Sequence, residues 1–151
     1  DFFDNATPSG ASVAIDVLLR LAAITGKADY EERATVCLRT LTPFVEDAPT
    51  AFGRLLAALE FYLARSQELA VIHPNNPLEA RALIDPVRLL YSPNLLLVGA
   101  AEGEGGDVSP LLQDRPALNG LPTAYVCERY VCQAPTTDPN QLLQQLQSLM
   151  P

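Results

Sequence analysis

The amino-acid sequence predicts a mixed α/β protein, in which three helices precede a small α/β layer of about three to four strands. Apolar residues recur at helical spacing over residues 1–66, whereas short uninterrupted apolar runs appear from residue 67 onwards. Most of the 13 prolines fall between these segments, where they mark turns rather than disorder. We therefore divide the chain into a helical region, residues 1–66, and an α/β region, residues 67–151.

The first helix is expected to begin at residues 7–9, Thr-Pro-Ser, because Pro is tolerated in a first turn and hydroxyl groups cap free N–H groups. Gly26 should end it, since glycine readily adopts the left-handed conformation of a helix C-terminus. The inward-facing stripe is predicted to comprise Val13, Val17, Leu18, Leu21 and Ile24.

Two more helices should follow on short connections, an arrangement that favours antiparallel packing. Asp29 with Glu32 has capping-box spacing, and Pro43 is expected to end this second helix. Its apolar face is predicted to contain Ala34, Cys37, Leu38 and Leu41. The third helix should open near Pro49 and present Phe52, Leu55, Leu56, Leu59 and Leu63.

The α/β region begins with an apolar run at residues 69–72, typical of a buried strand that ends at His73. A helix should start at Asn76-Pro77 and reach about Leu90, kinked or split by Pro86. Residues 95–98 read as a second buried strand. This order of elements favours a parallel pair with a right-handed crossover.

The remaining segments complete the layer. Residues 99–106, rich in Gly and Glu, are expected to form a mobile, solvated loop, because they match no phosphate-binding motif. Residues 123–133 read as one strand or a short hairpin, with Tyr125 and Tyr130 packing on the sheet. Asp138 should cap a terminal helix whose apolar face is Leu142, Leu143, Leu146 and Leu149.

Composition excludes several classes of function. The formal charge of -8 disfavours nucleic acid and anionic membrane as partners, because phosphate binding needs a surplus of Lys and Arg. One histidine cannot form a usual multi-histidine zinc site, so we expect no metal and no cofactor. Three cysteines suit a reduced, cytoplasmic, soluble protein better than a secreted disulfide scaffold. Because the chain lacks an initial Met, we expect a piece of a larger protein.

Two passages resemble one family closely. They are residues 1–10, DFFDNATPSG, and residues 115–127, RPALNGLPTAYVC, which continue into 132–139, CQAPTTDP. Together they are similar to the C-terminal region of the YyaL-like, spermatogenesis-associated family of thioredoxin-domain proteins, and the middle of the chain resembles it more loosely.

The resemblance implies an architecture more than a reaction. Such proteins carry a thioredoxin-like domain, then an α/α toroid similar to six-hairpin glycosidases and N-acylglucosamine epimerases, then a small α/β end. On this interpretation residues 1–66 are the last toroid helices and residues 67–151 the α/β end. The implied partners are the other domains of the parent chain, with self-association and a small-molecule or sugar ligand as further expectations.

The first candidate site is the polar segment before the first helix, comprising Asp1, Asp4, Asn5, Thr7 and Ser9. A helix N-terminus suits an anion or a sugar hydroxyl, and in toroids such loops lie at the cavity mouth, so Asp4, Asn5 and Ser9 are candidate ligand-binding residues. Asp4 is also a weak candidate for acid–base catalysis. The alternative is ordinary capping, because Asp, Asn, Ser and Thr are the usual capping residues.

The second candidate is the pair Cys127 and Cys132. In a straight strand their separation of five residues places them on opposite faces, whereas a hairpin turning at Glu128-Arg129 could bring them onto neighbouring strands as a redox pair. The alternative is two buried structural thiols, the role also expected of Cys37. His73, at a strand end, is either a turn residue or a ligand-facing group.

Three functions follow from these features. The first is a non-catalytic structural and interaction region of a longer thioredoxin-domain protein. The second is part of a carbohydrate-acting, glycosidase- or epimerase-like toroid enzyme, of which this chain alone would not be a complete catalyst. The third is a thiol-redox module that uses Cys127 and Cys132.

Overall fold

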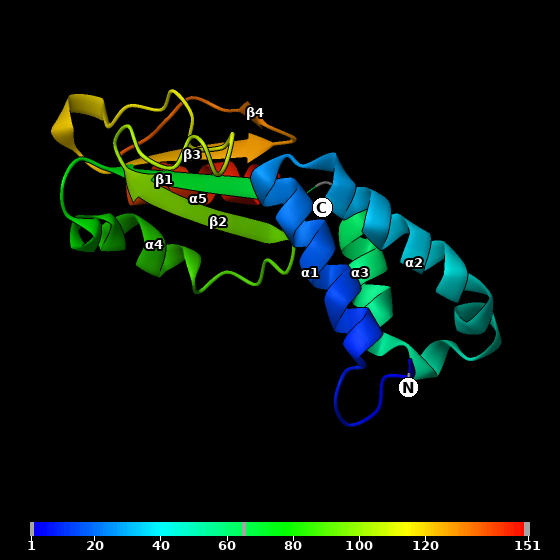
Figure 1. Cartoon of the computed structure of the whole chain (residues 1–151). Helices are drawn as coiled ribbons and strands as arrows, with labels where there is room; N and C mark the ends of the chain where they lie inside the picture. The colour runs from blue at the N-terminus through cyan, green and yellow to red at the C-terminus, as the bar shows by residue number, and fades with distance from the viewer. Residues whose placement is uncertain (1, 65, 150–151) are drawn as a thin grey trace. The chain divides into compact units, whose positions relative to one another are not determined.

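The structure is a computed structural model that describes residues 2–64 and 66–149. The chain divides into two compact units, residues 1–65 and 66–151, the first helical and the second built on a sheet (Figure 1). The described elements give a mixed α/β fold, as the sequence predicts, with a sheet of four strands. None of the helices in the described ranges is both long and apolar enough to cross a membrane.

The helical unit contains α1 (Gly10–Thr25), α2 (Ala28–Asp47) and α3 (Gly53–Leu63), with a 3-10 turn, η1 (Pro49–Ala51), before α3. The Ser9 hydroxyl caps α1 by accepting the backbone N–H of Ser12, and Gly26 ends it with φ of 69°. Both ends of α1 are therefore where the sequence predicts them.

The buried face of α1 differs from the predicted one. It consists of Ser12, Ile15, Asp16, Leu19 and Ala22, whereas Val13 and Val17 are 40% and 46% exposed. The prediction was wrong because it followed hydrophobicity alone. Ser12 and Asp16 have polar partners inside the unit. Because their hydrogen bonds are made there, a partly polar stripe of α1 can be buried.

Asp16 is the centre of an ionic network that joins α1 to α3. Its carboxylate lies 3.0 Å from Nε of Arg20 and 2.5 Å from a terminal nitrogen of Arg54. The Arg20 guanidinium also stacks over the Phe61 ring, 4.6 Å from the ring centroid. The two arginines therefore compensate the burial of Asp16 and fix which face of α1 meets α3.

Three expectations for α2 are wrong. The helix continues through Pro43 to Asp47, because a proline removes only one backbone hydrogen bond and its neighbours continue the helix. Its N-cap is Lys27, which makes no side-chain capping bond, so Asp29 lies inside the first turn. Cys37 is exposed, because the buried stripe of α2 is narrow and comprises Ala34 and Leu38.

The second unit is a sheet with the strand order β2-β1-β3-β4. The strands are β1 (Gln67–His73), β2 (Leu95–Ala101), β3 (Thr123–Glu128) and β4 (Val131–Cys132). The predicted parallel pairing of β1 with β2 is confirmed, and β3 is antiparallel to both β1 and β4. Because β1 lies between two neighbours, it is buried along almost its whole length.

The two faces of this sheet have different covers. On one face, Leu69 and Val71 of β1 pack with α4 (Arg81–Val87) and α5 (Pro139–Ser148), which supply Leu83, Val87, Leu142 and Leu146. On the other face, Ala70 and Ile72 pack with Leu111, Tyr125 and Cys127. Leu111 belongs to the segment 102–122, which contains one short 3-10 turn, η3 (Leu118–Gly120), and otherwise covers that face as irregular structure.

The ends of two elements differ from those predicted by the sequence. Residues 99–101 belong to β2, so the loop begins only at Glu102, because the parallel ladder with β1 extends to the pair His73 and Ala101. The helix expected to reach Leu90 is a 3-10 turn, η2 (Pro77–Ala80), followed by the shorter α4, which includes Pro86. Asn76 accepts the Leu78 N–H at its start, and Asp138 caps α5 as predicted.

The irregular cover predicts a test of packing. Replacing the fully buried Leu111 by Ala should lower the free energy of unfolding by about 2–5 kcal/mol, as for other large core residues. The matched control Val108→Ala, in the same segment but 60% exposed, should change it by less than about 0.5 kcal/mol. Urea denaturation followed by circular dichroism measures both. Equal, small effects would show that segment 102–122 is not a packed layer.

Candidate functional site

The two candidate cysteines lie opposite each other in the hairpin formed by β3 and β4. The turn residues are Arg129 and Tyr130, both with positive φ, 49° and 66°, the conformation of the tight turn that matches strand twist. This turn pairs Cys127 with Cys132 directly across the two strands, and the two residues form a disulfide. Of the alternatives left open by the sequence, the structure therefore adopts the hairpin.

The two sulfur-bearing residues differ in environment. Cys127 is completely buried and belongs to the apolar cluster beneath segment 102–122. Cys132 is only partly buried and lies on β4, a two-residue edge strand whose other member, Val131, is 77% exposed. A reagent in solution can therefore reach the disulfide more easily at Cys132 than at Cys127.

Sequence reasoning missed a third member of this site, Glu68. In the β1–β3 register Glu68 stands directly opposite Cys127, so the cross-strand row runs from Glu68 through Cys127 to Cys132. Residues directly opposite on an antiparallel pair share one face of the sheet. The signal was present in the sequence, because Glu68 alternates with Ala70 and Ile72 on the face that carries Cys127.

Glu68 is an acid buried within the sheet, only 1% exposed. Its Oε1 accepts the Ser66 hydroxyl at 2.7 Å, and its Oε2 accepts the backbone N–H of Tyr130 at 3.2 Å. Burial raises the pKa of the Glu68 carboxyl, and this effect outweighs the hydrogen bonds that favour its ionised form. The site thus places a buried carboxyl and a disulfide in one row.

The other candidate residues lie in the helical unit, where Asp4 braces the backbone. Its Oδ2 accepts the N–H groups of Arg54 at 2.8 Å and Leu55 at 3.1 Å, in the first turn of α3. Its Oδ1 accepts the Ser9 N–H at 2.8 Å. Asp4 is therefore the side-chain cap that α3 lacks locally, because the N-cap Phe52 makes no such bond.

The electrostatics of Asp4 agree with this capping role. Burial alone would raise the pKa of its carboxyl, but hydrogen bonds from backbone N–H groups and from the Ser12 hydroxyl hold the pKa below its usual value. Asn5 is exposed, and its N–H donates to the Thr7 carbonyl. Ser9 is buried as the cap of α1, while Asp1 lies outside the described residues. Asp4 and Ser9 are thus in direct contact, and ligand binding by this segment stays a prediction.

His73 ends β1 as predicted, and its carbonyl accepts the N–H of Glu102 at 2.9 Å. The Nδ1 atom of His73 is buried without a hydrogen-bond partner. Its strand-end position therefore anchors the start of segment 102–122.

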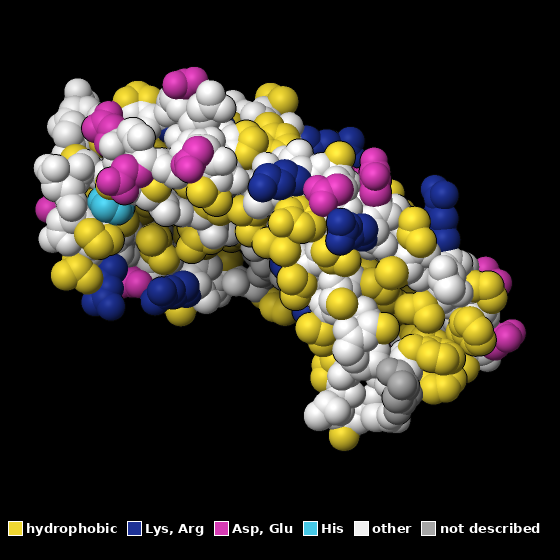
Figure 2. Space-filling view, in the orientation of Figure 1, with side chains coloured by type: hydrophobic (Ala, Val, Ile, Leu, Met, Phe, Trp, Pro, Cys, Tyr) yellow, Lys and Arg dark blue, Asp and Glu magenta, His cyan; other side chains and the backbone are white. Residues whose placement is uncertain are grey.

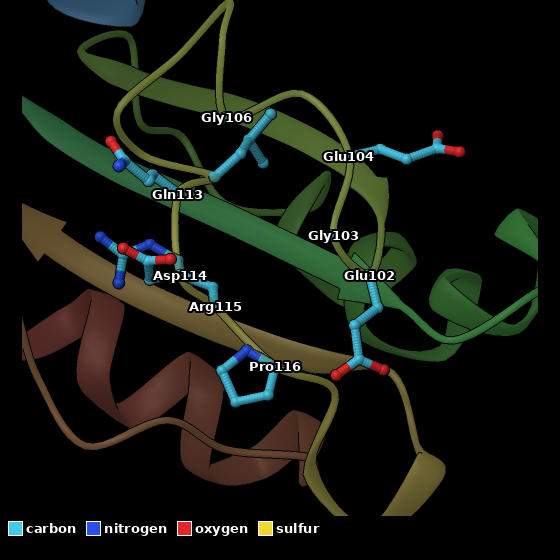
Figure 3. Close-up of a pocket in the computed structure, with 9 residues that line it drawn as sticks. Glu102, Gly103, Glu104, Gly106, Gln113, Asp114, Arg115 and Pro116 are labelled. Atoms are coloured by element: carbon cyan, nitrogen blue, oxygen red, sulfur yellow. The ribbon is translucent and has the colours of Figure 1, made fainter.

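A groove of about 490 Å³ lies along segment 102–122, lined by residues of its two arms (Figure 3). Glu102 lies beside Pro116 and accepts the Ala117 N–H, whereas Glu104 points away from the neighbouring arm. The Arg115 guanidinium lies over the Tyr125 ring, 5.0 Å from its centroid, and its Nε donates to the Leu111 carbonyl. These contacts hold the cover together, and across residues 2–64 and 66–149 no cluster of His, Cys, Asp and Glu has metal-site geometry.

Fold and site together define a mixed α/β protein with a sheet hairpin closed by a disulfide and flanked by a buried acid. The chain is homologous to spermatogenesis-associated protein 20, which confirms the resemblance in its two end passages. The human protein is 30% identical over 142 residues, and the rat protein 28% identical over 145 residues. Each match covers 92% of this chain.

The chain spans only 18% of the length of these two relatives, so it corresponds to a part of each. The mouse protein of the same name is likewise 28% identical over 145 residues. No protein-family model matches the chain, and no solved structure matches it. The relationship therefore rests on sequence identity along nearly the whole chain.

The position of Asp4 predicts a stability effect. Asp4→Ala removes the acceptor of three backbone N–H groups and should lower the free energy of unfolding by about 1–2 kcal/mol. Because the folded-state pKa is depressed, this stabilisation is present above the unfolded pKa, about 3.9, and disappears as pH falls through the folded value. Denaturation of both proteins between pH 3 and pH 7 measures the difference. The matched control is Asp29→Ala on the exposed side of α2, and an equal effect there would contradict the capping role.

Proposed function

We propose that this chain is a non-catalytic structural and interaction region of a longer protein of the spermatogenesis-associated, thioredoxin-domain type. The observation that carries the proposal is the set of apolar side chains exposed on the helical unit, some of them visible as hydrophobic patches in Figure 2. They are Phe3, Val13, Val17, Val36, Phe44, Leu56, Tyr62 and Leu63.

Exposed apolar side chains that lie next to one another on a unit indicate a surface made to be covered. Val13 and Val17 lie one turn apart on α1, so they form a continuous strip on the side away from the buried Ile15. The relatives are more than five times longer than the matched region, which supplies candidate neighbours within the parent chain. The toroid assignment of residues 1–66 and a cytoplasmic location belong to this proposal.

The carbohydrate-acting toroid remains an alternative that rests on the resemblance. In this chain the Asp4 carboxylate already accepts backbone N–H groups through both oxygens. A catalytic role would therefore require Asp4 to exchange a structural hydrogen bond for a substrate contact. The structural and interaction role requires no such rearrangement and is the simpler conclusion.

The exposed strip predicts self-association of the isolated chain. In sedimentation velocity over a range of concentrations, the chain should associate and should also bind a hydrophobic dye. Replacing both Val13 and Val17 by Lys should weaken association about tenfold or more, because two apolar contacts are lost. The matched control Val108→Lys, also an exposed valine but in the second unit, should leave association unchanged. A clean monomer without dye binding would contradict the interaction role.

A second candidate function is thiol–disulfide exchange, and the observation that favours it is the disulfide itself. A crosslink stabilises a fold mainly by restricting the unfolded chain, and that effect is smallest for short loops. Here the two cysteines are five positions apart and already paired by the β3–β4 turn. Chain restriction therefore explains little of this bond, whereas its partly exposed Cys132 is suited to exchange with another thiol.

Thiol titration under native conditions tests the exchange function. The oxidised protein should show one rapidly reacting thiol, the exposed Cys37, and two more after treatment with dithiothreitol and its removal. Cys37→Ser should remove the first thiol and leave the other two. The expected order is Cys132 before Cys127, because only Cys132 is partly exposed. A disulfide that dithiothreitol reduces only in denaturant would contradict the exchange function.

A further inference from the structure

We propose that Glu68 passes a proton to and from Cys127 when a dithiol opens and re-forms the Cys127–Cys132 disulfide. This inference rests on the thiol-exchange function above and adds a positioning and proton-transfer residue to it. The structural basis is the row formed by Glu68 on β1, Cys127 on β3 and Cys132 on β4, three strands that lie side by side in Figure 1.

The register of the sheet places the Glu68 and Cys127 side chains next to each other. Directly opposed residues of an antiparallel pair have Cβ atoms about 4.5–5.5 Å apart, and their side chains share a face. Glu68 therefore projects beside Cys127, and its carboxyl reaches along the sheet to the Tyr130 N–H within the turn that links the two cysteines. Glu68 therefore hydrogen-bonds the turn of the hairpin and lies opposite the disulfide of the same hairpin.

The groups around Glu68 act on its ionisation in opposite directions. Its carboxyl accepts the hydroxyl of Ser66, just before β1, and the backbone N–H groups of the turn residues Arg129 and Tyr130. Across β1–β2 it pairs with Leu96, which is buried and apolar. The neighbouring charge is the Glu128 carboxylate, which disfavours ionisation of Glu68. Within 102–122 the sheet is covered at this side by Leu111 and Leu112.

A purely structural turn clamp does not need an acid. A glutamine has the same shape and length, and its amide could accept the Tyr130 N–H and donate to the Ser66 hydroxyl. A buried carboxyl is disfavoured relative to such a neutral group whenever it is ionised. What the carboxyl adds at this position is the ability to release and take up a proton next to Cys127.

The exchange step balances as follows. A thiolate of the dithiol attacks the sulfur of Cys132, a new S–S bond forms, and the Cys127–Cys132 bond breaks with its electron pair on Cys127. Protonated Glu68 gives its proton to the Cys127 sulfur and later regains one from water. The second thiolate of the dithiol then attacks the first sulfur of the reagent and releases Cys132 as a thiolate, which water protonates. The dithiol is oxidised to a disulfide and the protein disulfide is reduced.

The difference in burial between the two cysteines explains why only one of them requires a proton donor. Cys127 is completely buried in an apolar cluster, where a bare thiolate is strongly disfavoured. Cys132 lies at the sheet edge, where water can solvate its thiolate. The proton donor is thus required beside Cys127, the residue that Glu68 faces.

The test compares single-turnover reduction by dithiothreitol from pH 5 to pH 9 for the wild-type chain and Glu68→Gln. Reduced thiols are trapped by alkylation and counted by mass spectrometry. Glu79→Gln, an exposed acid on η2 in the same unit, is the matched control. The wild-type rate should exceed that of Glu68→Gln about tenfold or more at low pH, in the range of general acid catalysis. The ratio should fall to one or below as pH rises through the pKa of Glu68, while Glu79→Gln follows the wild type.

The outcomes separate the two proposals. A ratio that does not change with pH would mean that Glu68 acts only through structure, and this inference would be wrong while thiol exchange stands. A wild-type disulfide that resists dithiothreitol under native conditions would overturn both.

If Glu68→Gln does not fold, the wild-type protein provides the second measurement. The ¹³C resonance of the Glu68 carboxyl should show an additional inflection at the pH where Cys127 ionises in the reduced protein only, as expected for coupled groups. A reduced-state titration identical to the oxidised one would contradict proton exchange between them.

Discussion

The second unit depends on the burial of one strand, β1, on both of its faces. Because β1 pairs with β2 on one side and β3 on the other, its side chains must be covered above and below the sheet. Two helices cover one face, and the irregular segment 102–122 covers the other. Glu68 lies in that strand and is therefore buried, and its carboxyl accepts a hydrogen bond from the Tyr130 N–H of the hairpin turn.

The helical unit follows a different constraint, the need to compensate buried carboxylates. Asp16 is paired with Arg20 and Arg54, and the backbone N–H of the same Arg54 donates to Asp4. One residue at the start of α3 thus connects both acids to a single helix. These bonds orient α1 so that its polar positions face inwards and its valines face outwards. The surface that we assign to interaction is a consequence of that orientation.

The contrast between the units explains which features could be predicted. Strands β1 and β2 were recognisable from the apolar runs at residues 69–72 and 95–98, and the caps Ser9 and Asp138 because capping is a local interaction. The expectation that the second run is buried was wrong, because β2 is an edge strand in which Leu97 is 44% exposed. The face of α1 was not recognisable, because one of the two arginines that pair with the buried Asp16 is Arg54, which is 38 residues away. The Asp4 cap likewise spans 50 residues to Arg54, whereas Cys37 was misplaced because the buried stripe of α2 is narrow. Long-range polar pairs leave no periodic trace in a single sequence.

The same reasoning bears on the disulfide. Spacing alone left Cys127 and Cys132 either apart or joined, and the decision lay in two turn residues, Arg129 and Tyr130, that adopt positive φ without glycine. The buried Glu68 carboxyl accepts the N–H of that turn, so a residue about 60 positions earlier helps to set the geometry that pairs the cysteines. The position of Glu68 on β1 therefore accounts both for its hydrogen bond to the turn and for the proton transfer to Cys127 that we propose. Only the second depends on the carboxyl being able to ionise, and this difference separates a structural acid from a chemical one.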